Sequence, residues 1–156
     1  MSSFTDKLAL IAPGPGTYAL VFNSPSNNTV QVGKLGRCVV LPGYYVYIGS
    51  AFGPGGLRAR LKRHCAPCKK LHWHIDYLKT VVRLEEIWYT QDQLHLEHKW
   101  AEAYTQCTEV VVPYAGFGAS DCHCLTHLFF SEKAPQVSEF AARLSTKSVV
   151  AVLRER

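Results

Sequence analysis

A dense run of glycine and proline separates a predicted strand from a predicted helix and limits what this chain can fold into. Residues 44–50 are rich in tyrosine, valine and isoleucine, which favour a strand, whereas Gly-Pro-Gly-Gly at 53–56 fits no regular element. A helical pattern begins at Leu57. On that helix Arg60 and His64 are four positions apart and share one face, opposite the tyrosines that end the strand. A phenol, a guanidinium and an imidazole in this arrangement suit an anionic phosphate.

The rest of the chain predicts a single α+β domain, in which short antiparallel strands are joined by turns and flanked by helices. Its 156 residues, 47% of them apolar, suffice for one globular core. We place that core at about 16–130 and a C-terminal extension at about 131–156, while residues 1–15 do not indicate a structure. Strands are predicted at 17–22, 29–32, 37–41, 44–50, 84–89, 110–112 and 149–153, and a terminal helix at 137–144.

Residues 71–82 fit either a strand or a helix. As a strand they would place His72, His74 and Asp76 on one face. As a helix they would form an apolar stripe, and because this stripe is the longer pattern we predict a helix. The stripe comprises Leu71, Ile75, Leu78 and Val82.

A further helix is predicted at 90–106. Thr90 and Gln93 have the spacing of a capping box, with Thr90 as the N-cap residue. Glu97 lies at the border of the stripe that this helix would bury, whereas Glu102 would face solvent. Glu97 is therefore the better candidate for a functional carboxylate. The buried stripe comprises Leu96, Trp100, Tyr104 and Cys107.

Two tripeptides carry a family resemblance. Gly16-Thr17-Tyr18 and Tyr47-Ile48-Gly49, followed by Arg60, His64 and Glu97 in helical context, resemble the GIY-YIG nuclease family. The segments KKLHWHIDYL and FGASDCHCLTHLFF resemble a small subgroup of it, found alone or fused to DNA-repair glycosylase domains. The resemblance covers most of the chain and implies the same fold class, a small, mostly antiparallel sheet flanked by helices.

The resemblance also implies a role for each residue of the site. Tyr18 would position or deprotonate the attacking water, and Tyr47 would support that water or a phosphate oxygen. Arg60 would hold the scissile phosphate, and His64 would relay a proton. Glu97 would bind Mg²⁺ or Mn²⁺. Because the ordinary pKa of tyrosine is about 10, Tyr18 needs a metal or a cationic neighbour to act near neutral pH.

Three features depart from the family pattern. Thr17 replaces the usual isoleucine, which a strand tolerates. The glycine-rich loop at 53–56 lengthens the connection between Tyr47 and Arg60. Many family members also carry a late asparagine, whereas here no asparagine follows Asn28.

Charge indicates a nucleic-acid partner. The net charge is +5 and the pI is about 8.9. Many basic residues cluster in and just after the helix predicted to begin at Leu57. A solvated helix face is the ordinary alternative, but the cluster lies inside the motif, so we expect it to contact phosphates of DNA, with RNA as the alternative. Its members are Arg58, Arg60, Lys62, Arg63, Lys69 and Lys70.

The sequence does not indicate membrane insertion or secretion. It has no apolar stretch of the roughly 18 residues that a transmembrane helix needs, and its first residues lack a signal-peptide pattern. We therefore expect a cytoplasmic protein without a membrane partner. The residues leave its oligomeric state open.

The chain has six cysteines, which we interpret as thiols or metal ligands because a reducing compartment disfavours disulfides. Cys122-x-Cys124-x-x-His127 could bind structural Zn²⁺ with Cys65-x-x-Cys68, or with the histidines of 71–82. Packed thiols and a hydrogen-bonded histidine are the preferred alternative. A third interpretation adds Asp121 or those histidines to the catalytic cavity. The candidates for this additional site are His72, His74, Asp76, Asp121, Cys122, Cys124 and His127.

These observations favour a metal-dependent endonuclease that hydrolyses DNA phosphodiester bonds. Because so small a basic cluster contacts few phosphates, we expect structure-specific cutting, as in repair, rather than sequence-specific cutting. The alternative is a non-catalytic nucleic-acid-binding module, stabilised by zinc. Binding alone does not require Glu97 beside the tyrosines, so the nuclease is preferred.

Overall fold

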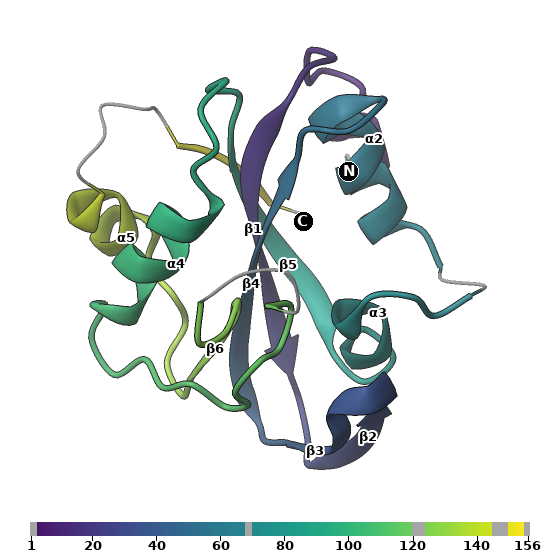
Figure 1. Cartoon of the computed structure of the whole chain (residues 1–156), viewed down its shortest axis with the longest axis vertical. Coiled ribbons are helices and arrows are strands. Elements are labelled where there is room, and N and C mark those ends of the chain that lie inside the picture. Colours follow the sequence, from purple (N-terminus) through teal and green to yellow (C-terminus); the bar gives the residue numbers. More distant parts are fainter. Residues whose placement is uncertain (1–2, 68–69, 120–123, 145–149, 155–156) are drawn as a thin grey trace.

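The computed structural model describes residues 3–67, 70–119, 124–144 and 150–154. The strands of its main sheet are β1 (Gly16–Ser24), β4 (Gly43–Ala51), β5 (Arg83–Thr90), β6 (Leu128–Ser131) and β7 (Ala151–Arg154). Their order is β6-β4-β1-β5-β7, every pair of neighbours is antiparallel, and helices cover both faces (Figure 1). The predicted α+β class is confirmed.

The central strand β1 contributes to two cores, one on each face of the sheet. The helices are α1 (Phe4–Leu8), α2 (Gly56–Cys65), α3 (His74–Leu78), α4 (Glu97–Thr105) and α5 (Val137–Arg143). Tyr18 and Leu20 belong to the core under α1, α2 and α3, whereas Ala19 and Val21 belong to the core under α4 and α5. Because both of its faces are covered, β1 is almost continuously buried, and its residues 18–22 are all apolar or aromatic.

The glycine-rich loop leads directly into α2. Gly55 occupies the N-cap position with φ of 83°, a left-handed conformation that glycine adopts at little cost. Leu57 and Leu61, four positions apart on this helix, are fully buried. Helix α1, which the sequence did not predict, contacts α2 and begins with a capping box between Ser3 and Asp6.

A separate two-stranded sheet lies beside α3. Strands β2 (Asn28–Val32) and β3 (Gly36–Val40) are joined by a 3₁₀ turn, which agrees with the two predicted strands. Val32 and Val40 are fully buried in the core on the α2 and α3 side. The hairpin therefore extends that core to one end of the molecule (Figure 1).

The region predicted as a helix at 71–82 contains only the short helix α3, and the strand alternative is wrong. The late start of this helix is explained by the fully buried Asp76. Its carboxylate accepts hydrogen bonds from the backbone N–H groups of His72 and Trp73, both at 2.9 Å. These bonds start the helix at His74 and hold the preceding residues outside it.

The helix predicted at 90–106 begins later than expected, at Glu97. Thr90 pairs with Thr17 in the sheet, so it cannot be an N-cap, and the proposed capping box is wrong. The predicted stripe of α4 is confirmed, since Leu96, Trp100 and Tyr104 are buried and Cys107 packs against them.

The sheet edge next to β4 also differs from the prediction. Instead of a strand at 110–112 there is a single bridge between Val111 and Phe130. The strand on that edge is β6, which the sequence did not predict. The terminal helix α5 and strand β7 agree with prediction except at their ends, and residue 149 lies outside the described residues.

The described residues after 130 pack against the rest of the chain. Phe140 of α5 stacks on Trp88 at 5.5 Å between ring centroids and meets Trp100 edge-on at 5.0 Å. Strand β7 pairs with β5. None of the helices in the described residues is long and apolar enough to span a membrane.

Candidate active site

The candidate site lies where β4 runs past the end of β6. The pairing of these strands stops at Tyr47 and Leu128, and beyond it the Ile48 N–H donates to the His127 carbonyl at 2.9 Å. A cavity of about 370 Å³ opens next to this uncovered edge. It is lined by Tyr18, Tyr47, Gly49, Ser50, Phe52, Arg60, Trp73, Glu97, His98 and Gly118.

Four of the five residues predicted to be catalytic line this cavity, and they come from four different elements. Tyr18 comes from β1, Tyr47 from β4, Arg60 from α2 and Glu97 from α4. The fifth, His64, lies behind Tyr18 and is buried. The structure thus brings together side chains that are far apart in the sequence.

Tyr18 and His64 form a buried pair. The Tyr18 Oη atom lies 2.7 Å from His64 Nε2, and the two rings are tilted by 56°. His64 Nδ1 is buried and has no hydrogen-bond partner among the described residues. Burial raises the pKa of Tyr18 well above its usual range, against the positive charge of Arg60, and burial lowers the pKa of His64 to about 3. Both side chains are therefore uncharged near neutral pH.

Gly49 makes room for the Tyr18 ring. It is directly opposite Tyr18 in the pairing of β1 with β4. A Cβ atom at this position would lie 2.5 Å from Tyr18 Oη and 2.6 Å from Cζ, closer than van der Waals contact allows. Glycine is therefore required at position 49, because any side chain there would collide with the Tyr18 phenol.

Arg60 is held at the cavity by contacts that include Ser50 and Trp73. Its Nη1 donates to the Ser50 carbonyl at 2.9 Å, and its guanidinium lies 4.6 Å from the centroid of the Trp73 ring. Arg60 also lines a second hollow of about 200 Å³, formed by the glycine-rich loop and Arg63. Arg60 thus lines both the cavity and this hollow at the start of α2.

Arg63 was predicted to bind substrate, but the structure gives it an internal partner. Its guanidinium forms an ion pair with Asp76 at 3.2 Å and lies 3.7 Å from the centroid of Trp73. Burial alone would raise the pKa of Asp76, but the N–H groups of His72 and Trp73 and the Arg63 charge together lower it. The Arg63 side chain is 37% exposed, so part of it faces solvent.

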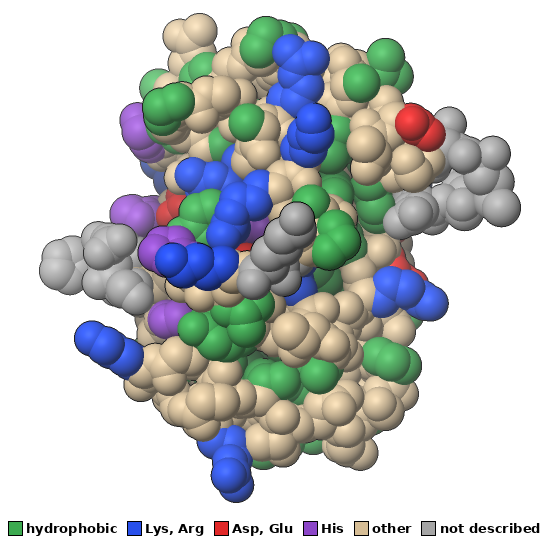
Figure 2. Space-filling view, turned by 90° about the vertical axis from the view of Figure 1, so that its right-hand side faces the viewer, with side chains coloured by type: hydrophobic (Ala, Val, Ile, Leu, Met, Phe, Trp, Pro, Cys, Tyr) green, Lys and Arg blue, Asp and Glu red, His purple; other side chains and the backbone are tan. Residues whose placement is uncertain are grey.

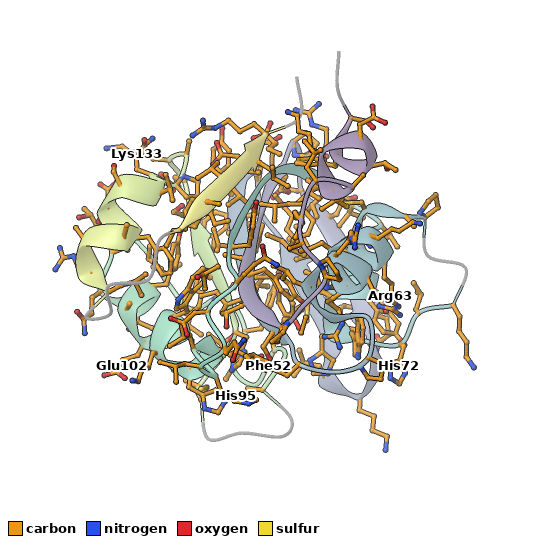
Figure 3. The ribbon with its side chains drawn as sticks, turned by 90° about the horizontal axis from the view of Figure 1, so that it is seen from above. Phe52, Arg63, His72, His95, Glu102 and Lys133 are labelled. Atoms are coloured by element: carbon orange, nitrogen blue, oxygen red, sulfur yellow. The ribbon has the colours of Figure 1, made fainter. Side chains whose placement is uncertain are left out.

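Glu97 opens α4, and its carboxylate extends to the edge of β4. Its Oε1 accepts a hydrogen bond from Ser50 Oγ at 3.1 Å, and its Oε2 lies 3.4 Å from His127 Nδ1. The side chain is 25% exposed. Glu102, on the same helix, is exposed and points away from the cavity (Figure 3). The preference for Glu97 over Glu102 agrees with this geometry.

The other predicted basic residues lie around the face that α2 and α3 cover. Figure 2 shows Lys and Arg side chains gathered near the middle of this face, with histidines beside them. Arg58 is partly exposed, and Lys62 and Lys70 are exposed. Lys69 lies outside the described residues.

The candidates for an additional site separate into two places. His74 accepts a hydrogen bond from the Gly118 N–H at 2.9 Å, and His72 is exposed beside Trp73. Cys124 and His127 lie on the other side of the cavity, near α4. Neither Cys65 nor the two histidines of 71–82 joins them among the described residues. Cys68, Asp121 and Cys122 lie outside the described residues.

Several cavity residues were not identified from the sequence. Trp73 and Ser50 adjoin predicted residues, but their side chains matter only through contacts with Arg60 and Glu97. Phe52 stacks on His95 with ring centroids 3.8 Å apart, and the two lie together in Figure 3. Because Phe52 and His95 are far apart in the sequence, no residue pattern predicted that their rings stack.

A second, larger hollow is not part of this site. It measures about 450 Å³ and lies between the end of α4 and the start of α5. Lys133, which lines it, is far from Phe52 in Figure 3. Its lining includes none of the residues predicted to be catalytic, so this larger hollow is not the candidate site.

Fold and cavity together define an α+β domain with a polar site at one edge of its sheet. The model of a protein family described as domain of unknown function DUF123 matches residues 17–150, and the chain belongs to that family. No curated protein and no solved structure matches the chain significantly.

Proposed function

We propose that this protein is a metal-dependent endonuclease of the GIY-YIG type that hydrolyses DNA phosphodiester bonds, with a structure-specific role in repair. The observation that carries the proposal is the convergence of Tyr18, Tyr47, Arg60 and Glu97 on one cavity. These groups supply a cation for a phosphate, a carboxylate for a metal and phenols for a water molecule.

Arg60 is the group best suited to a scissile phosphate. Its guanidinium is oriented by the Ser50 carbonyl, by Trp73 and by a hydrogen bond to Tyr18, and it lines the cavity where an anion would bind. A planar guanidinium can bind two phosphate oxygens at once, and this orientation reduces the entropy that binding would cost. The adjoining hollow beside Arg63 would accommodate the next phosphate of a strand.

The donor set at Glu97 fits Mg²⁺ or Mn²⁺. A single carboxylate that is partly exposed at a polar cavity suits an ion that keeps most of its waters and also binds substrate phosphate. When bound, such an ion supplies positive charge and an acidified water. The Ser50 hydroxyl and His127 hold the carboxylate in place.

Tyr18 and His64 would handle the proton of the attacking water. Because the pKa of Tyr18 is raised by burial, the phenol does not ionise by itself near pH 7. The phenol oxygen can instead take the water proton while its own proton passes to His64 Nε2, 2.7 Å away. The resulting imidazolium would be stabilised by the negative phosphate at Arg60. Tyr47, whose ring lies 6.3 Å from that of His64, would support a phosphate oxygen or the water.

The proposal is tested by cleavage of labelled nucleic acids in Mg²⁺, Mn²⁺ or EDTA. The panel contains duplex, nicked, flapped, branched and single-stranded DNA and one RNA duplex. Wild type is compared with Glu97→Gln and with Glu102→Gln, a matched change on the exposed side of the same helix. We expect metal-dependent cutting of one DNA structure, lost by at least 100-fold in Glu97→Gln and kept in Glu102→Gln.

A non-catalytic nucleic-acid-binding module is the competing function. This function is favoured by the stacking of Arg60 and Arg63 on Trp73, because a cationic surface of this kind can serve binding without catalysing a reaction. Salt-sensitive binding without cutting on any substrate, unchanged in Glu97→Gln, would replace the nuclease by this module.

A further inference from the structure

Three metal-binding side chains meet on the α4 side of the cavity. His98 comes from the first turn of α4, and Cys124 and His127 come from the segment before β6. One ligand atom from each lies within 4.8 Å of the others. In a tetrahedral zinc site, bond lengths of about 2.0–2.3 Å separate the ligand atoms by roughly 3.3–3.8 Å. Small side-chain rotations would therefore bring the three donors around one ion.

The surroundings of His127 favour one ring nitrogen as a ligand. His127 is buried, and its Nδ1 lies 3.3 Å from the Ile48 carbonyl and 3.4 Å from Glu97 Oε2. Because both neighbours are acceptors, the ring proton belongs on Nδ1, and Nε2 carries the lone pair. A histidine that donates one N–H to a carboxylate or carbonyl while its other nitrogen binds metal is the usual arrangement in zinc sites.

We propose that His98, Cys124 and His127 bind one Zn²⁺ ion, with the fourth position open to a ligand from outside this trio. Two imidazoles and a thiolate select zinc over Mg²⁺ or Ca²⁺, which prefer oxygen. The site is therefore chemically distinct from the carboxylate site at Glu97. Binding converts the Cys124 thiol to a thiolate and releases its proton to solvent.

The bound ion would link α4 to the segment before β6. His98 follows Glu97 in the sequence, and His127 touches the Glu97 carboxylate, so zinc would fix Glu97 from two sides. This consequence concerns position and stability, and it holds whether or not the protein cuts DNA.

The test is zinc binding by the full-length protein after treatment with a chelator. Zn²⁺ is titrated in competition with a chromophoric chelator, and Co²⁺ is used as a spectroscopic probe for thiolate ligation. We expect one equivalent at submicromolar Kd, a higher Tm with Zn²⁺, and no displacement by excess Mg²⁺. His98→Ala and Cys124→Ser should each weaken binding at least 100-fold, and Cys124→Ser should abolish the sulfur-to-cobalt absorption. Cys65→Ser and His72→Ala are matched controls expected to keep full affinity.

Two outcomes would overturn the proposal. One is wild-type protein that binds no Zn²⁺ at micromolar concentrations. The other is binding that survives both His98→Ala and Cys124→Ser, or that is lost in Cys65→Ser or His72→Ala. Because these measurements do not use cleavage, they are independent of the nuclease proposal.

Discussion

Tyr18 Oη and His64 Nε2 are 2.7 Å apart across the interface between the central strand and α2. No other hydrogen bond to the His64 ring is present among the described residues. Both side chains are buried, and this contact satisfies His64 Nε2, whereas His64 Nδ1 has no hydrogen-bond partner among the described residues. The hydrogen bond between Tyr18 and His64 therefore stabilises the fold and also lies on the proposed path of proton transfer.

Replacing Tyr18 by Phe should remove this contact while keeping the ring. His64 would be left buried with both nitrogens unpaired, at a cost of about 1–3 kcal/mol in the free energy of unfolding. Cleavage should fall by at least 100-fold, since proton transfer of this kind contributes roughly that much. Urea denaturation and single-turnover cleavage measure the two effects.

Tyr89→Phe is the matched control for this change. Tyr89 is directly opposite Tyr18 in the neighbouring strand but does not line the cavity. We expect it to keep cleavage within about threefold of wild type. Equal loss of activity in both variants would mean that the cavity does not depend on the Tyr18 phenol.

Gly49→Ala should displace the Tyr18 ring. The added methyl group would lie 2.5 Å from Tyr18 Oη, so the ring or the strand must move. Overpacking of this kind costs about 1–3 kcal/mol in the free energy of unfolding. Gly53→Ala is the control, because a Cβ there meets no atom within 4 Å and Gly53 is exposed. Thermal unfolding of the two variants compares them directly, and similar Tm values would contradict the close approach.

Local rules predicted the part of the site that lies around α2. The strand at 44–50, the break at 53–56 and the spacing of Arg60 and His64 all follow from neighbouring residues, and the structure agrees with each of them. Helix α4 was predicted too early, because Thr90 has a good capping pattern but stays in the sheet. Pairing with β1 outweighs that local preference.

Contacts between distant segments could not be predicted in the same way. Ser50 and Glu97 are 47 positions apart, and His127 and Ile48 are 79 apart. The four residues of β6 acquire their role from pairing with β4, and His98 acquires its partners only once α4 lies against that edge. Such relationships depend on the packing of elements, which no residue pattern within one element expresses.

Asp76→Asn should weaken the support beneath Trp73. The buried Asp76 carboxylate accepts two backbone hydrogen bonds and pairs with Arg63. The asparagine side chain carries no charge, and its NH₂ group would face either these N–H groups or the Arg63 guanidinium, all of which are donors. We expect a loss of about 2–3 kcal/mol in the free energy of unfolding and weaker DNA binding. Asp92→Asn, in a turn where the side chain accepts the Leu94 N–H at 2.9 Å, should cost less than about 1 kcal/mol. Urea denaturation gives the comparison, and equal losses would contradict a special role for Asp76.

His64 should make the fold sensitive to mild acid. The unfolded chain takes up a proton at His64 near pH 6.5, whereas in the folded protein burial lowers the pKa to about 3. Between these values only the unfolded state binds the proton, so the free energy of unfolding falls as pH falls, by up to about 1.4 kcal/mol per pH unit. Asp76 adds to this effect only at the acidic end of the range, because its pKa is lowered from 3.8 and its contribution is lost as pH falls through about that value and below.

The test of this prediction is the free energy of unfolding at pH 7 and pH 5 for wild type and His64→Gln. Glutamine can retain a hydrogen bond to Tyr18 but does not titrate. The decrease between the two pH values should therefore be smaller in His64→Gln, by about 1–2 kcal/mol. His74 and His127, whose pKa values are also lowered by burial, act equally in both proteins and cancel in the difference. Equal acid sensitivity would show that His64 binds its proton in the folded state, and the neutral Tyr18–His64 pair would then be wrong.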